Sequence, residues 1–184
     1  MGRIKFNWNL EKILGISAMS ISFITLIIFI YQTNLMSKQN YLSILPYVQV
    51  STSNNPSDNS FALRLLNHGV GPAIIESVTM IYDGKTTDLT DHNNEILPYL
   101  ISLDPSLDSI QNYSLATLNK GMAIPANSVY SFLEVKNSKK EYNLITAALF
   151  RLEEEGLDYE IVYRSIQNER WMVNNTSDGP VKLD

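Results

Sequence analysis

Hydrophobic positions divide this chain into one long uniform run and a series of short alternating segments. The run covers residues 13–33, contains no charged residue, and is followed by further neutral residues as far as Lys38. At 1.5 Å rise per residue, about 21 helical residues span roughly 31 Å, the thickness of the hydrocarbon core of a bilayer. The run therefore predicts a membrane-spanning helix.

The residues on either side of the run predict whether it is cleaved and how it is oriented in the membrane. The run exceeds the roughly 7–15 apolar residues of a cleaved signal peptide, and the following TNLMSKQNYL has no A-x-A-like pair, so an uncleaved signal-anchor is favoured. Arg3, Lys5 and Lys12 precede the run, whereas Lys38 alone follows it closely. The positive-inside bias then predicts that residues 1–12 are cytoplasmic and that the C-terminal domain is periplasmic or extracellular, with the helix in a bacterial inner membrane.

A stripe of small and weakly polar residues follows one face of the predicted helix. Its members are Gly15, Ala18, Ser22 and Thr25, and Phe29 and Gln32 continue the same spacing. Small residues let helix backbones approach in lipid, so the stripe predicts self-association or docking to a partner's membrane helix. The alternative is a chance stripe, because these residue types are common in membrane helices.

Beyond the helix, short segments of alternating hydrophobicity are separated by turn residues, which is typical of an antiparallel β-sandwich. Leu144, Ala148 and Leu152 instead recur at helical spacing, so an amphipathic helix is predicted over 141–155, with Gly156 as its C-terminal glycine. A shorter helix is predicted over 93–103, capped by Asp91 and interrupted at Pro98. The predicted strands cover residues 47–51, 61–65, 73–82, 85–89, 113–118, 129–135, 159–164 and 171–173. The expected fold is mainly β, with one or two short helices.

Three local signals predict how the middle strands are joined. Asn67, Gly69, Gly71 and Pro72 form a structural turn, in which glycine permits positive φ or close backbone approach and proline fixes the exit. Glu76 and Ser77 interrupt the next apolar strand and predict a bulge. The dipeptide at 83–84, Asp-Gly, matches a two-residue hairpin of type I′.

These patterns divide the chain into five parts. They are a basic N-terminus (1–12), a transmembrane helix (13–33), a juxtamembrane linker (34–45), the β-sandwich domain (46–173) and a polar tail (174–184). The tail is expected to be disordered, and residues 52–60 are expected to form a polar loop.

Four stretches carry a resemblance to a known group of proteins. They are Leu-Pro-Tyr at 45–47, Leu-Leu-Asn-His-Gly-Val-Gly-Pro-Ala at 65–73, Ile-Pro-Ala-Asn at 124–127, and Ile-Val-Tyr-Arg-Ser at 161–165 with a trailing Trp171. The order resembles uncharacterised bacterial single-pass membrane proteins in which an immunoglobulin-like (Ig-like) sandwich contains an N-x-G-x-G-P-A turn. The resemblance implies an anchored Ig-like domain and implies no activity.

Charge and cysteine content exclude several classes of function. The chain carries a net −5, while residues 1–40 hold four basic residues and one acidic residue, a net +3, which leaves −8 for residues 41–184. So acidic a domain lacks the cationic surface that binds nucleic acid. The chain has no cysteine, which excludes disulfides, thiolate catalysis, cysteine-type zinc sites and an acylated lipoprotein anchor.

Candidate chemistry in the domain is sparse. His68 and His92 lack the H-x-x-H or H-x-H spacing of metal ligands, and no catalytic or cofactor-binding motif is present. Asp88, Asp91, His92 and Glu95 form an acidic cluster, which indicates a helix start or, alternatively, a cation site. Tyr163 and Trp171 are candidates for an exposed contact patch, with core aromatics as the alternative.

Three functions are consistent with this sequence. The first is a membrane-anchored, non-enzymatic scaffold whose outward-facing sandwich binds a protein partner. The second is an oligomeric membrane effector or sensor with a cytoplasmic ligand-binding domain. The third is a metal-assisted hydrolase that uses the cluster from Asp88 to Glu95.

Overall fold

The structure, a computed structural model, describes residues 9–183, so Arg3 and Lys5 lie outside the described residues. The chain divides into two units, one ending at Leu42 and the other beginning at Ser43. We refer to residues 43–183 as the β unit and describe each unit by itself.

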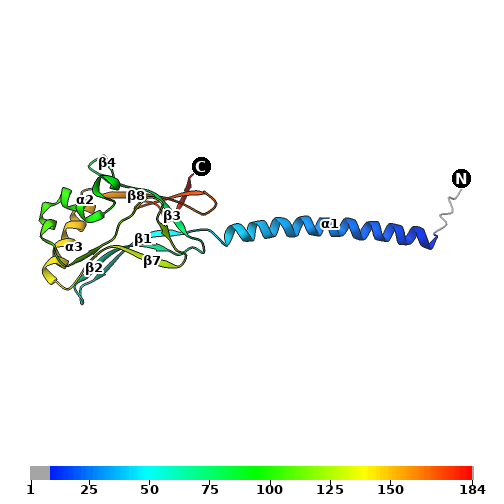
Figure 1. Cartoon of the computed structure of the whole chain (residues 1–184), viewed down its shortest axis with the longest axis horizontal. Coiled ribbons are helices and arrows are strands. Elements are labelled where there is room, and N and C mark those ends of the chain that lie inside the picture. The colour runs from blue at the N-terminus through cyan, green and yellow to red at the C-terminus, as the bar shows by residue number, and fades with distance from the viewer. Residues whose placement is uncertain (1–8, 184) are drawn as a thin grey trace. The chain divides into compact units, whose positions relative to one another are not determined.

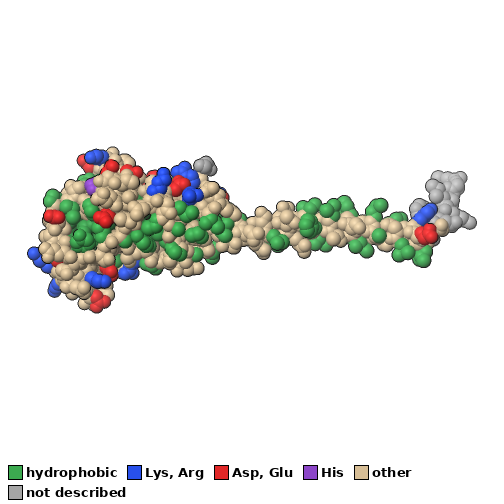
Figure 2. Space-filling view, viewed as in Figure 1, with side chains coloured by type: hydrophobic (Ala, Val, Ile, Leu, Met, Phe, Trp, Pro, Cys, Tyr) green, Lys and Arg blue, Asp and Glu red, His purple; other side chains and the backbone are tan. Residues whose placement is uncertain are grey.

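Helix α1 extends from Leu10 to Leu42 and contains the predicted span 13–33. The helix continues through residues 34–42, which belong to the predicted juxtamembrane linker and whose sequence is compatible with helical structure. None of its residues is buried, and among the described residues it is the helix long and apolar enough to cross a membrane. Figure 2 shows hydrophobic side chains along its length. A membrane anchor and a signal sequence both satisfy this pattern.

Sheet A contains β1 (Val48–Asn55), β2 (Ser60–Asn67), β7 (Ser128–Val135) and β5 (Tyr113–Leu115), in the antiparallel order β1-β2-β7-β5. The β1–β2 ladder continues to the pair Asn55 and Ser60. The predicted polar loop over 52–60 is therefore wrong for residues 52–55, which lie in β1, and for Ser60, which begins β2. Polar side chains are compatible with this edge strand because only one of its faces meets the core.

Sheet B has the order β10-β9-β8-β3-β4, and a short strand β6 also pairs with β3. The predicted strand at 73–82 is confirmed, and the register of β3 against β8 shifts between Ile75 and Ser77, which confirms the bulge. Asp83 and Gly84 have φ of 50° and 70°, as a type I′ hairpin requires. The bounds are β3 Ala73–Tyr82, β4 Lys85–Asp88, β6 Ala123–Ile124, β8 Asp158–Arg164, β9 Arg170–Asn174 and β10 Val181–Leu183.

The C-terminal tail is partly ordered, contrary to the sequence-based expectation. Val181, Lys182 and Leu183 pair with Met172, Trp171 and Arg170 as an antiparallel edge strand. A three-residue strand after a polar loop has no alternation long enough to recognise, which is why the pattern does not reveal it.

The helical segments lie at one end of the β unit (Figure 1). Helix α3 (Lys139–Glu154) confirms the predicted amphipathic helix, and Gly156 follows it with φ of 95°. The region from 89 to 109 forms a 3₁₀ helix η1 (Leu89–His92), helix α2 (Ile96–Leu103) and a second 3₁₀ helix η2 (Pro105–Ser109).

The expected cap and break in the shorter helix are both wrong. The helix begins at Ile96 as α2, and its N-cap residue is Glu95, which makes no side-chain cap bond. Asp91 lies within η1, which is capped by Asp88 accepting from the backbone N–H of Thr90. Pro98 does not interrupt α2, because it lies in the first turn, where a missing N–H costs no intrahelical bond.

Both sheets and the two longer helices of the β unit share one hydrophobic core. Sheet A contributes Leu65 and Leu133, sheet B contributes Ile75 and Ile161, and each of these is at most 2% exposed. Strands β1, β2 and β7 form one layer and β3 and β8 the other in Figure 1. Two antiparallel sheets around one core fit a β-sandwich.

Candidate binding site

Asn67 joins three segments of the β unit at the predicted structural turn. Its side chain is buried, and its Oδ1 accepts from the backbone N–H groups of Tyr47 at 3.1 Å and Gly69 at 3.0 Å. Its Nδ2 donates to the backbone oxygens of Gly71 at 2.8 Å and Ile124 at 3.1 Å. One amide therefore satisfies polar groups of the entry segment, the turn and the β6 segment together.

The two glycines of this turn are required by close backbone approach. A Cβ added to Gly69 would lie 2.4 Å from the carbonyl oxygen of Leu45, and one added to Gly71 would lie 1.8 Å from that of Ile44. Pro72 is half-buried and leads directly into β3. Asn67, Gly69, Gly71 and Pro72 thus hold the entry segment 44–47 against the β unit and present no reactive group.

The candidate contact patch does not form as predicted. Tyr163 is completely buried, and its hydroxyl accepts a hydrogen bond from the backbone N–H of Val48 at 3.3 Å. Burial raises the pKa of Tyr163 to about 12. Tyr163 therefore belongs to the core, and its assignment to an exposed patch is corrected. Trp171 is half-buried, with the ammonium of Lys182 at 5.7 Å from its ring centroid.

The histidines and the acidic cluster have structural contacts. His92 packs edge-on against Tyr99, with ring centroids 5.2 Å apart, and His68 is exposed in the Asn67 turn. The Asp88 carboxylate accepts from the backbone N–H and the hydroxyl of Thr90, and these bonds lower its pKa. Within residues 9–183, no group of three or more His, Asp or Glu side chains is placed to hold a metal ion.

The stripe on α1 is exposed along its whole length. The hydroxyls of Ser22 and Thr25 donate to the backbone oxygens of Ala18 and Ile21 at 2.9 and 2.8 Å, within the helix itself. A Cβ on Gly15 would meet nothing within 4 Å. The stripe is thus available to a second helix.

A cavity in the β unit lies between its two sheets. We call it the inter-sheet cavity; its volume is about 160 Å³. Sheet A lines it through Val50, Leu63 and Phe132, and sheet B lines it through Val78 and Ile161. Met80 of β3 adds to the sheet B side, and the remaining apolar walls come from α2, α3 and neighbouring loops: Ile96, Leu100, Leu118, Leu149 and Leu157.

One side of the inter-sheet cavity is polar and open. Thr52 on β1, Glu153 on α3 and Asn175 after β9 line the cavity and are exposed, so they mark its mouth. Tyr159 lies among them; burial raises its pKa to about 12, and the charges of Asp158 and Glu153 add to the rise. The negative charge of Glu153 therefore disfavours ionisation of the Tyr159 hydroxyl.

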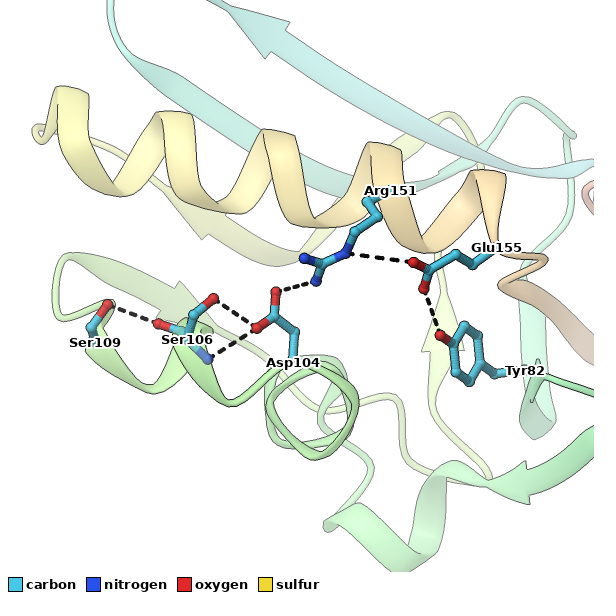
Figure 3. Close-up of polar contacts among 6 residues, drawn as sticks. All are labelled: Tyr82, Asp104, Ser106, Ser109, Arg151 and Glu155. Carbon is cyan, nitrogen blue, oxygen red and sulfur yellow. Dashed lines mark hydrogen bonds and ion pairs between the residues drawn. The ribbon is translucent and has the colours of Figure 1, made fainter.

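A polar network fixes α3, the helix that forms one wall of the cavity (Figure 3). The Arg151 guanidinium lies 2.5 Å from the buried Asp104 carboxylate and 3.8 Å from Glu155. Glu155 in turn accepts from the Tyr82 hydroxyl at 2.6 Å. These contacts join α3 to the start of η2 and to the end of β3.

Sequence reasoning did not bring the mouth residues together. Thr52 falls in the predicted polar loop, Glu153 in a run of solvated glutamates and Asn175 in the predicted tail. Only the alternation of Val48 and Val50 could have been extended to place Thr52 on the inner face of β1. The other two positions depend on tertiary packing.

Comparison with models of known protein families gives no match, and no curated protein matches the sequence significantly.

Proposed function

We propose that this chain is a non-enzymatic, single-pass membrane protein whose Ig-like β-sandwich binds a protein partner. In this proposal α1 is an uncleaved anchor in a bacterial inner membrane. The N-terminus is cytoplasmic and the β unit is periplasmic or extracellular. The N-x-G-x-G-P-A turn supports the proposed relation to similarly anchored Ig-like proteins, because it gives the chain a rigid entry into the β unit.

The observation that carries partner binding is the free edge of β1. Val48 donates its N–H to Tyr163 rather than to β2, so its backbone groups point away from β2. Backbone direction alternates along a strand, and Val50 and Thr52 therefore also point outward. Within residues 9–183, the backbone groups of Val50 and Thr52 make no hydrogen bond across this edge. An extended segment of a partner can add to such an edge as a further strand.

Photocrosslinking in intact membranes tests this proposal. A benzophenone side chain at the exposed position Gln49 on β1 is expected to capture a partner, and the same group at Lys140 on α3 serves as the control. Thr52→Pro removes an outward N–H without removing a bond to β2, so it should abolish the crosslink. Thr52→Val retains the N–H and should preserve it. Identical crosslinks at both positions, or a crosslink indifferent to proline, would contradict strand addition.

The inter-sheet cavity favours a second candidate function. A cavity with apolar walls and a polar mouth suits a ligand-binding sensor. In this candidate the β unit lies in the cytoplasm, and ligand binding changes the oligomerisation of the protein through the α1 stripe. Reporter fusions at the C-terminus separate the two candidates. Activity of a periplasm-dependent reporter supports the anchored partner-binding protein, and activity of a cytoplasm-dependent reporter supports the sensor.

A further inference from the structure

The inter-sheet cavity is of a size and chemistry that suit a small ligand. Its volume of about 160 Å³ is close to that of an engineered apolar cavity, about 150 Å³, that stays dry and binds benzene. Eleven of its fifteen lining residues are Val, Leu, Ile, Met or Phe. A hydrocarbon group of about six carbon atoms therefore matches the space that the core leaves open.

The mouth of the cavity determines which polar group such a ligand would carry. Glu153 lines the mouth, its charge is felt at Tyr159, and no hydrogen bond or ion pair of its carboxylate with the described residues is present. No Lys, Arg or His is among the described residues that line the cavity. The nearest cation on the same helix, Arg151, is engaged by Asp104 and Glu155. The mouth is thus acidic and lacks a compensating charge.

Two further groups at the mouth provide hydrogen-bond acceptors. Thr52 carries a hydroxyl and Asn175 a side-chain oxygen, and both residues line the mouth; the Asn175 side-chain nitrogen donates to the Leu157 carbonyl at 3.5 Å. An ammonium group carries three donors and no acceptor. Glu153, Thr52 and Asn175 can together accept those donors at the point where the apolar cavity meets water.

We propose that the inter-sheet cavity binds a small primary amine, with an apolar body of about six carbons between the two sheets and its ammonium group at Glu153. A carboxylate of the same shape is disfavoured, because Glu153 would repel it. This site goes beyond the proposed binding of a protein partner at the β1 edge and does not depend on it.

Three probes of one shape test the proposal: benzylamine as the cation, benzyl alcohol as the neutral analogue and phenylacetate as the anion. Each is titrated into the full chain in lipid nanodiscs, with free probe concentration measured, while methyl resonances are followed by NMR. The methyl groups of Ile161 line the cavity and report binding, whereas those of Ile74, on the same sheet, do not line it and serve as the internal control.

We expect saturable shifts at Ile161, with benzylamine binding up to about fivefold more tightly than benzyl alcohol, the upper end for an exposed charge pair, and phenylacetate binding most weakly. Glu153→Gln should abolish the preference for the amine and leave the alcohol unchanged. Glu154→Gln, which removes an adjacent carboxylate that does not line the cavity, should keep the preference. Leu63→Phe should weaken all three probes by filling the cavity, with the melting temperature confirming that the variant folds.

Three results would overturn the proposal. They are the absence of saturable shifts at Ile161, equal affinity for the amine and the anion, and unchanged binding in a folded Leu63→Phe variant. Crosslinking from Gln49 would remain interpretable in each case, because it reports on the β1 edge and not on the cavity.

Discussion

At the scale of single residues, the buried Asn67 amide links three backbone segments of the β unit. It is 1% exposed, and its amide provides both acceptor and donor to backbone groups of three segments. A buried backbone group left without its hydrogen bond costs about 1–3 kcal/mol. The same turn leaves no room for a Cβ at Gly71, so a substitution there would also disrupt the packing of the turn against the entry segment.

Asn67→Ala is expected to lower the free energy of unfolding of the β unit by about 3–5 kcal/mol, because several buried polar groups lose their partner at once. Asn119→Ala is the matched control, since among the described residues that exposed amide donates to the Thr117 hydroxyl alone. Urea unfolding of both variants, followed by tryptophan fluorescence, measures the difference. Equal midpoints for the two variants would show that the Asn67 bonds do not stabilise the fold.

At the scale of elements, local signals predicted those features of the fold that depend on neighbouring residues. The Asp83-Gly84 hairpin, the bulge beside Glu76 and the glycine after α3 each follow from backbone geometry within a few positions. The end of β1 and the strand β10 were missed because they form only when a partner strand supplies the register. Tyr163 was ambiguous because alternation does not distinguish a core aromatic from an exposed one.

The contact between α3 and η2 gives the β unit a predictable response to acid. Hydrogen bonds from Ser106 and the guanidinium of Arg151 lower the pKa of Asp104 in the folded chain. A carboxylate with a lowered folded pKa stabilises the fold fully above its unfolded pKa of about 3.9, and that stabilisation is lost as the pH falls through the folded value. The Asp104 contribution is therefore present at neutral pH and lost in acid.

Asp104→Asn is expected to lower the unfolding free energy by about 1–2 kcal/mol at pH 7, because a charged acceptor of several hydrogen bonds is lost. The difference from the unmodified chain should shrink as the pH falls below about 4. Urea unfolding across that range measures it, with the exposed Asp108→Asn in η2 as the control. A difference between the two chains that does not change with pH would assign the effect to packing rather than to ionisation.

At the scale of the whole molecule, the residues of the candidate site come together only through tertiary packing, which a sequence pattern does not record. Thr52, Glu153 and Asn175 are separated by up to 123 positions, and the pairing of two sheets and the placement of α3 bring them to one mouth. A cavity is a mismatch of side-chain shapes and so has no periodic signal. The long apolar run of α1, by contrast, is visible directly, because composition alone defines it.

The proposed anchor can be tested separately from every claim about the β unit. An arginine near the middle of a spanning helix costs about 2.5–3.5 kcal/mol of insertion free energy. Ile21→Arg combined with Ile28→Arg should therefore move the protein from the carbonate-resistant membrane fraction to the soluble fraction, whereas Ile21→Ala combined with Ile28→Ala should leave it in the membrane. Mass spectrometry of the extracted native chain should find residues 10–42 still attached, as an uncleaved anchor requires. A soluble native chain that lacks those residues would identify α1 as a cleaved signal sequence and would remove the anchored arrangement, while leaving the β1 edge and the inter-sheet cavity open to the same experiments.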